Sequence, residues 1–323
     1  MKLMVTSSPH IHSGETTSRL MRDVLLGLIP VLVAAIWLFG LRALTLTVVS
    51  VLSCVVSEWG YRMITRQDNT LPDGSAVVTG VLLSLTLPVS VPYWIVVVGG
   101  VFAIVVVKGL VGGLGQNVFN PALAARAFLM LFWPQWLVRF PEVGTEVSAG
   151  QFSVDIVSSA TPLHHMQMPA LPQESLWDMF LGNIGGSMGE VCTLAILLGG
   201  GYLLARKVIS WRIPVAYLGS VAVLSLVFSK GDDPVLWMVY SLLGGGLMLG
   251  AFFMATDYAT SPVTPRGQLI YGVGCGVLTV VFRYFGHFPE GVTYAILLMN
   301  TGAWVLDELT PPQRFGTERG GVR

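Results

Sequence analysis

The chain has 323 residues, of which 53% are hydrophobic and only 11% are charged. Soluble domains carry about 25% charged residues, so this chain has too few charges to cover a water-soluble globule. Its formal net charge of zero leaves no basic surface for nucleic acid, and we exclude that class of partner. Together with the 37 glycines, which let transmembrane helices approach closely, these values indicate a membrane protein.

Apolar segments of membrane-span length recur along the whole chain. A span needs roughly 20 apolar residues. The candidate segments are residues 24–41, 44–64, 75–87, 94–110, 121–138, 191–208, 213–228, 235–255, 268–284 and 292–305. We therefore predict an all-α polytopic membrane protein with about ten transmembrane helices. The polar stretch 1–23 has no small-residue cleavage site after it and is expected to remain as a cytoplasmic leader.

Two of the predicted helices carry breaks rich in proline and threonine. The first reads TLPVSVP and the second TDYATSPVTP, and each is followed by an apolar helix and then by a segment with asparagine, GQNVFNPALAARAF and YAILLMNTGAWVLD. Irregular backbone at membrane depth is tolerated where it lines an internal site. The pattern predicts two five-helix halves, 24–138 and 191–306, in opposite orientations with broken helices, as in many transporters.

Charge placement predicts the orientation in the membrane. With ten spans and a cytoplasmic N-terminus, the external segments hold only four basic residues, whereas every internal segment is basic. The four external ones are Arg42, Arg139, Lys230 and Arg283. We therefore expect the tail 307–323 to be cytoplasmic and the loop 139–190 to lie outside.

Ionisable residues inside spans are costly and usually functional. Glu58, Arg126 and Asp257 are the ones found here, and Asp257 at the second break suits a cation or a proton. Arg126 follows a helix start with Asn120 as N-cap and Pro121 at the first position, where an anionic cofactor group could bind. Buried ion pairs that only hold helices together remain an alternative.

The three cysteines, Cys54, Cys192 and Cys275, lack the spacing of a metal or iron–sulfur motif, and no metal site is expected within this chain. A cysteine ligand shared across a subunit interface stays open.

The loop 139–190 contains the short stretch DIVSSATPL, which offers three hydroxyls before a proline. Pro162 restricts the preceding Thr161 to an extended backbone. An accessible hydroxyl on such a loop suits covalent modification, although an ordinary, unmodified surface turn would have the same sequence pattern.

Four stretches together resemble one known family over essentially the whole chain. They are SSPHIHSGETTSRLMRDVLLGLIP, GLGQNVFNPALAARAF, DIVSSATPL and MATDYATSPVTPRGQLIYGVGCG. They are similar to the D subunit of the Rnf ion-translocating ferredoxin:NAD oxidoreductase complex and, more distantly, to the B subunit of the sodium-translocating NADH:quinone oxidoreductase. The short leader favours the Rnf protein.

The resemblance implies a covalent flavin. In that family a flavin transferase attaches flavin mononucleotide (FMN), through its phosphate, to a threonine in a motif close to D-x-x-S/T-G-A-S/T. Thr161 is the acceptor that this motif implies, and the motif positions before it are Asp155, Ser158, Ser159 and Ala160. Ser159 departs from the glycine common at its position. A second, non-covalent flavin such as riboflavin is also implied, with Asn120 and Arg126 as candidate contacts.

The resemblance further implies a membrane electron-transfer subunit rather than a complete enzyme. The chain has no G-x-G-x-x-G motif after a strand, so NADH and ferredoxin would react on partner subunits. Electron flow would be coupled to Na⁺ or H⁺ movement in the bacterial inner membrane, with Asp257 and Glu58 as candidates for the ion path. A cofactor-free channel or solute carrier built from the same inverted repeat is the alternative from another class.

Overall fold

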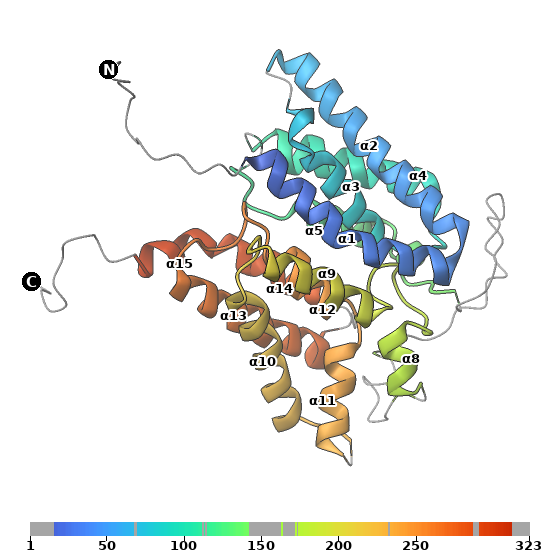
Figure 1. The fold of residues 1–323 in the computed structure, drawn as a ribbon, viewed down its shortest axis with the longest axis vertical. Helices are drawn as coiled ribbons and strands as arrows, with labels where there is room; N and C mark the ends of the chain where they lie inside the picture. Colours follow the sequence, from blue (N-terminus) through green and yellow to red (C-terminus); the bar gives the residue numbers. More distant parts are fainter. Residues whose placement is uncertain are drawn as a thin grey trace, which may run out of the picture.

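The computed structural model describes residues 16–67, 70–111, 113, 115–141, 163, 172, 174–231, 233–286 and 291–311. In these ranges the regular elements are helices, so the all-α class is confirmed. Figure 1 shows the helices of the first half of the chain gathered on one side and those of the second half on the other.

The first half begins with two long helices joined at Gly40. Helix α1 starts earlier than the predicted span, because Thr16 caps it by accepting the Arg19 N–H at 3.3 Å. The cytoplasmic leader predicted to reach residue 23 therefore includes the first turns of a helix. The helices of this half are α1 (Thr17–Phe39), α2 (Leu41–Thr65), η1 (Leu71–Asp73), α3 (Ser75–Leu85), α4 (Tyr93–Val101), the π-helix η2 (Phe102–Gly109), α5 (Pro121–Phe132) and α6 (Pro134–Leu137).

The second half contains one long helix and several short ones. The helices are α8 (Leu176–Leu181), α9 (Thr193–Ala205), α10 (Arg212–Val227), α11 (Pro234–Leu243), α12 (Leu247–Leu249), the π-helix η3 (Gly250–Met254), α13 (Pro265–Phe285), α14 (Val292–Thr301) and α15 (Ala303–Leu309). Each of the predicted apolar segments is thus largely helical. Helix α8 lies in the loop between the predicted halves.

Three of the described helices have the length and composition of a membrane span. Among the described residues, α1, α2 and α13 are each long and apolar enough to cross a membrane, and α11 with α12–η3 makes a fourth if the bent pair counts as one span. That pair is bent by 63°. The other apolar helices have 10–17 residues. These lengths agree with a multi-pass membrane protein, whereas ten spans in two inverted repeats remain a prediction.

The two halves meet along two helix pairs. Helix α1 packs on α9, and α5 packs on α14. Within the halves, α2 contacts α3 and α4, while α10 contacts α11 and α13. The α1–α9 contact is close because glycines face each other there: a Cβ on Gly199 would lie 2.0 Å from the Gly27 carbonyl oxygen. The space between the halves is bounded by the long helix α1 as well as by shorter helices and breaks.

Two buried arginines bind the carbonyls of irregular segments. Arg42 binds the first predicted break, and Arg283 binds the turn between α11 and α12. Arg42 donates from Nε to the Val89 carbonyl at 2.9 Å and from Nη2 to the Val91 carbonyl at 3.3 Å, within the first break. Arg283 donates to three carbonyls, of Ser241 at 2.6 Å, Gly244 at 2.8 Å and Gly245 at 3.0 Å. Both arginines were assigned to external loops by sequence, yet both are at least nine-tenths buried. They donate to carbonyls that no helix satisfies, in the α3–α4 break for Arg42 and at and after the end of α11 for Arg283.

The second of these regions was not predicted. The expected break of the eighth segment lies at its end, and the structure breaks the chain there and also between α11 and α12. Gly245 and Gly246 adopt φ values of +59° and +52°, a region that residues with a Cβ rarely occupy. The run of three glycines in this segment therefore makes the sharp turn possible.

Candidate functional site

The main cavity lies between the two halves and has a volume of about 60 Å³. One water molecule needs about 10–15 Å³ by the same measure, so the space admits several waters or a thin ring. Its polar lining comes from both halves and comprises Ser75, Thr79, Lys108, Asn117, Asn120, Thr256 and Asp257. Its apolar lining includes Met21, Val24, Leu82, Phe252 and Phe253. We call this space the inner cavity.

Asn120 stands where the two halves meet. As predicted, it caps α5: its side-chain oxygen accepts the N–H groups of Ala122 at 3.1 Å and Leu123 at 3.3 Å. Its amide nitrogen donates to the Met254 carbonyl of the other half at 3.4 Å. Asn300, with its amide oriented to donate to the Ile296 carbonyl, accepts the Asn120 N–H at 3.2 Å. The asparagine segments that suggested the repeat are therefore in contact.

Asn117 was not singled out from the sequence, yet it offers the clearest sign of a ligand. It is 5% exposed and lines the inner cavity, and its side-chain oxygen has no hydrogen-bond partner among the described residues. Leaving a buried acceptor unpaired costs about 1–3 kcal/mol. A bound water or a ligand N–H would remove that cost.

Asp257 lies at the second break, as predicted, and its side chain lines the inner cavity. Its Oδ2 accepts the Thr260 hydroxyl at 3.2 Å, and its carbonyl accepts the Ser261 N–H at 3.0 Å. The ion pairs seen in the described part of the chain do not include it. The carboxylate is thus held by local backbone and hydroxyl contacts in the unwound segment.

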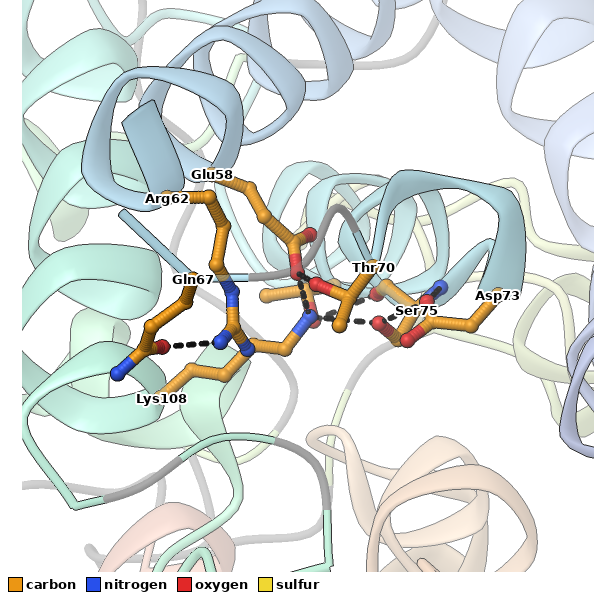
Figure 2. A network of polar contacts seen from close by, with 8 residues as sticks. Glu58, Arg62, Gln67, Thr70, Asp73, Ser75 and Lys108 are labelled. Atoms are coloured by element: carbon orange, nitrogen blue, oxygen red, sulfur yellow. Dashed lines mark hydrogen bonds and ion pairs between the residues drawn. The ribbon is translucent and has the colours of Figure 1, made fainter. Parts of the chain in front are cut away.

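Glu58 forms a buried ion pair with Lys108, which lies near the predicted cytoplasmic end of the segment 94–110. Lys108 Nζ donates to Glu58 Oε1 at 2.5 Å and to the Ser75 hydroxyl at 2.6 Å (Figure 2). Thr70 also donates to Glu58 Oε1, at 2.7 Å, and Ser75 in turn donates to Asp73. Glu58 and Lys108 are each 2% exposed. Sequence reasoning left such a pair open as an alternative to the ion path.

Arg126 follows Asn120 by six positions, more than one turn of α5, and faces a different space. A second cavity, of about 10 Å³, is lined by Arg126, Glu190 and the Gly245–Gly246 turn, and we call it the outer cavity. Arg126 Nη2 lies 3.5 Å from the Ser187 hydroxyl, and Glu190 Oε1 accepts the Ser187 N–H at 2.9 Å. The two residues proposed together as flavin contacts therefore line neighbouring cavities.

The flavin-attachment stretch lies outside the described residues, which include neither Asp155 nor 158–161. Leu163, two positions after the predicted acceptor, is described and is 4% exposed. It packs on the α11–α12 turn, since a Cβ on Gly245 would come within 2.8 Å of Leu163 Cδ2. Leu163 itself therefore lies against the turn that lines the outer cavity.

Known proteins match this chain over nearly its whole length. The model of the NQR2, RnfD, RnfE family matches residues 4–316. The chain belongs to this family. Within it, the chain is 45% identical to the D subunit of the Na⁺-translocating ferredoxin:NAD⁺ oxidoreductase complex of Acetobacterium woodii, covering 99% of this chain and 97% of that protein.

Two further family members also match this chain over nearly its whole length. The D subunit of the proton-translocating ferredoxin:NAD⁺ oxidoreductase complex of Clostridium ljungdahlii is 39% identical over 98% of this chain and 96% of its own length. The D subunit of the ion-translocating oxidoreductase complex of Stutzerimonas stutzeri is 39% identical over 95% and 94%. These names assign Na⁺ to one relative and protons to another, so family membership does not select the ion.

Proposed function

We propose that this chain is the membrane electron-transfer subunit of an ion-translocating ferredoxin:NAD⁺ oxidoreductase complex and carries FMN covalently on Thr161. The observation that carries the proposal is the near full-length similarity to the D subunits of such complexes. The other subunits supply the sites for ferredoxin and NAD⁺, and a flavin transferase supplies the FMN phosphate. The complex lies in the bacterial inner membrane.

The experiment is a denaturing gel of the protein from cells that contain the transferase. A covalent flavin gives a fluorescent band under ultraviolet light at the size of this 34.8 kDa chain. A dark band would favour the cofactor-free channel or carrier instead. Co-purification with the remaining subunits tests the assembly independently of the flavin.

The mixed polar and apolar lining of the inner cavity supports placing the ring of a second, non-covalent flavin such as riboflavin there. A flavin supplies a ring that stores electrons, and its ring edge carries carbonyls and an N–H. Asn117 Oδ1, buried without a partner among the described residues, would accept that N–H, while Phe252 and Phe253 form apolar walls. Asn120, whose amide is committed to the helix cap and to Met254, would shape the end of the site.

Removing the Asn117 acceptor is expected to empty this site. Asn117→Leu should lose most of the non-covalent flavin, because a ligand N–H would then be buried without a partner. The measurement is the amount of flavin that denaturation releases, determined by chromatography. The covalent flavin of the same protein, seen as fluorescence on a denaturing gel, is the control. Full retention in Asn117→Leu would place the second flavin elsewhere.

Asp257 is the group that we propose to bind the transported ion in the inner cavity. A hard cation prefers oxygen ligands, and unwound backbone can add carbonyls to the carboxylate. Glu58 would be available to an ion only after leaving Lys108. Arg126 remains a candidate for the anion contact at the outer cavity.

Asp257→Asn is expected to abolish most ion uptake by proteoliposomes of the complex while flavin content stays normal, because the side chain keeps its shape but loses its charge. Electron transfer and ion uptake are measured on the same preparation. Normal uptake in a fully assembled variant would remove Asp257 from the path, and poor assembly would point to a structural role of its carboxylate in the unwound segment instead.

The proposed orientation predicts the reactivity of two engineered cysteines. One at Gln151, in the predicted external loop, should react with a membrane-impermeant thiol reagent added to intact spheroplasts. One at Gln67, an exposed residue after α2, should react only when the membrane is opened. The reverse pattern would place the attachment loop in the cytoplasm and overturn the charge-based topology.

A further inference from the structure

Lys108 presents a positive charge to the inner cavity. Lys108 and Ser75 line this space, whereas Glu58, the counter-ion, is not among the lining residues. The ammonium therefore lies closer to a bound ligand than the carboxylate that balances it. Two of its N–H groups are used by Glu58 and Ser75, and a lysine has three.

The ammonium is fixed in place from several sides. Glu58 is itself held by the Thr70 hydroxyl, and Ser75 is held by Asp73 through both its hydroxyl, at 2.5 Å, and its backbone N–H, at 2.7 Å (Figure 2). These residues come from α2, from η1 with its N-cap, and from α3, while Lys108 lies in the last turn of η2. A charge held this firmly acts at a defined distance, and in a buried site its field is weakly screened.

The remaining charge at the inner cavity is Asp257, which comes from the other half of the chain. A ring bound between the halves would thus have a cation on one wall and a carboxylate on another. When a partner carrier gives electrons to the ring, the carrier is oxidised and the ring gains negative charge. A nearby ammonium stabilises that charge, whereas a carboxylate opposes it.

We propose that Lys108 sets the reduction potential of the non-covalent flavin in the inner cavity, with Glu58 as a positioning residue that holds the ammonium in place. The proposal rests on the second flavin proposed above. Lys108 raises the potential by stabilising the charge that the ring takes up on reduction. The ion pair therefore serves electron transfer as well as packing.

The test is a redox titration of the non-covalent flavin in the purified complex, with dithionite as reductant. Removing one partner of a buried pair is strongly destabilising, while replacing both is often tolerated. The informative variant is therefore the double change Glu58→Gln with Lys108→Met. Its flavin is expected to titrate at a lower midpoint potential than in the unaltered complex, and Lys108→Arg, which keeps the charge, close to the original value.

A control removes a second ion pair, whose two residues do not line the inner cavity. Arg206 Nη2 pairs with Asp23 Oδ2 at 3.3 Å between α9 and α1, and neither residue lines the inner cavity. The double change Asp23→Asn with Arg206→Met should leave the midpoint unchanged. An unchanged midpoint in the Glu58–Lys108 variant with flavin retained would overturn the role of Lys108. Absence of any releasable flavin from the unaltered complex would instead overturn the second flavin.

Discussion

A Thr161→Ala protein is expected to give a dark band on a denaturing gel, with complete loss of covalent flavin. The phosphoester needs the threonine hydroxyl, and alanine offers no oxygen to the transferase. Thr161 belongs to the predicted external loop, where a side chain is expected to contribute little to packing, so the free energy of unfolding should change by no more than about 0.5 kcal/mol. In-gel fluorescence measures attachment, and the yield of membrane-inserted protein measures folding.

Neighbouring hydroxyls provide the controls for this variant. Ser158→Ala and Ser159→Ala each remove one hydroxyl from the same stretch and should keep the fluorescent band. A fluorescent Thr161→Ala band would move the attachment to one of these serines. Thr161→Ser should retain part of the flavin, because it keeps the hydroxyl but loses the methyl group.

Helix positions followed well from the sequence because they depend on local composition. Segments such as 44–64 and 268–284 are apolar over nearly their whole length, and the structure gives α2 and α13 there. The start of α5 was also predictable, since an asparagine cap followed by proline is a local signal. Local patterns fix where a helix begins, even in a membrane protein.

The pairing of charges did not follow from the sequence. Lys108 and Glu58 are 50 positions apart, and Lys108 looked like an ordinary basic residue at the end of an internal segment. Arg283 likewise looked like an external charge, yet it binds carbonyls about 40 positions earlier in the chain. Only the packing of helices on each other brings such groups together, and a count of loop charges cannot reveal it.

The candidate site was predicted in part. Asp257 was expected at a break in a helix and lies there, lining the inner cavity. Asn120 and Arg126 were grouped because they lie close in sequence, but a helix turns about 100° per residue, so residues six positions apart can face two spaces. Asn117 gave no signal of its own, because its importance comes from an unpaired oxygen that only the fold creates.

The close contact between α1 and α9 leads us to expect that alanine has opposite effects on stability at two glycines of α9. Gly199 is buried, and a Cβ there would lie 2.0 Å from the backbone oxygen of Gly27. That oxygen cannot rotate away as a side chain could, so Gly199→Ala must push α1 and α9 apart. Overpacking costs about 1–3 kcal/mol where the structure can adjust. We expect at least that loss here, together with poor assembly of the two halves.

Gly201 is the matched control, because it lies in the same helix and a Cβ there meets nothing within 4 Å. Alanine is favoured over glycine inside a helix by about 1 kcal/mol, so Gly201→Ala should leave stability unchanged or raise it. Thermal unfolding of the detergent-purified proteins compares the two variants under identical conditions. Equal melting temperatures would mean that α1 and α9 do not meet as closely as the structure has them. A lower melting temperature for Gly199→Ala alone would show that this glycine contact joins the two halves.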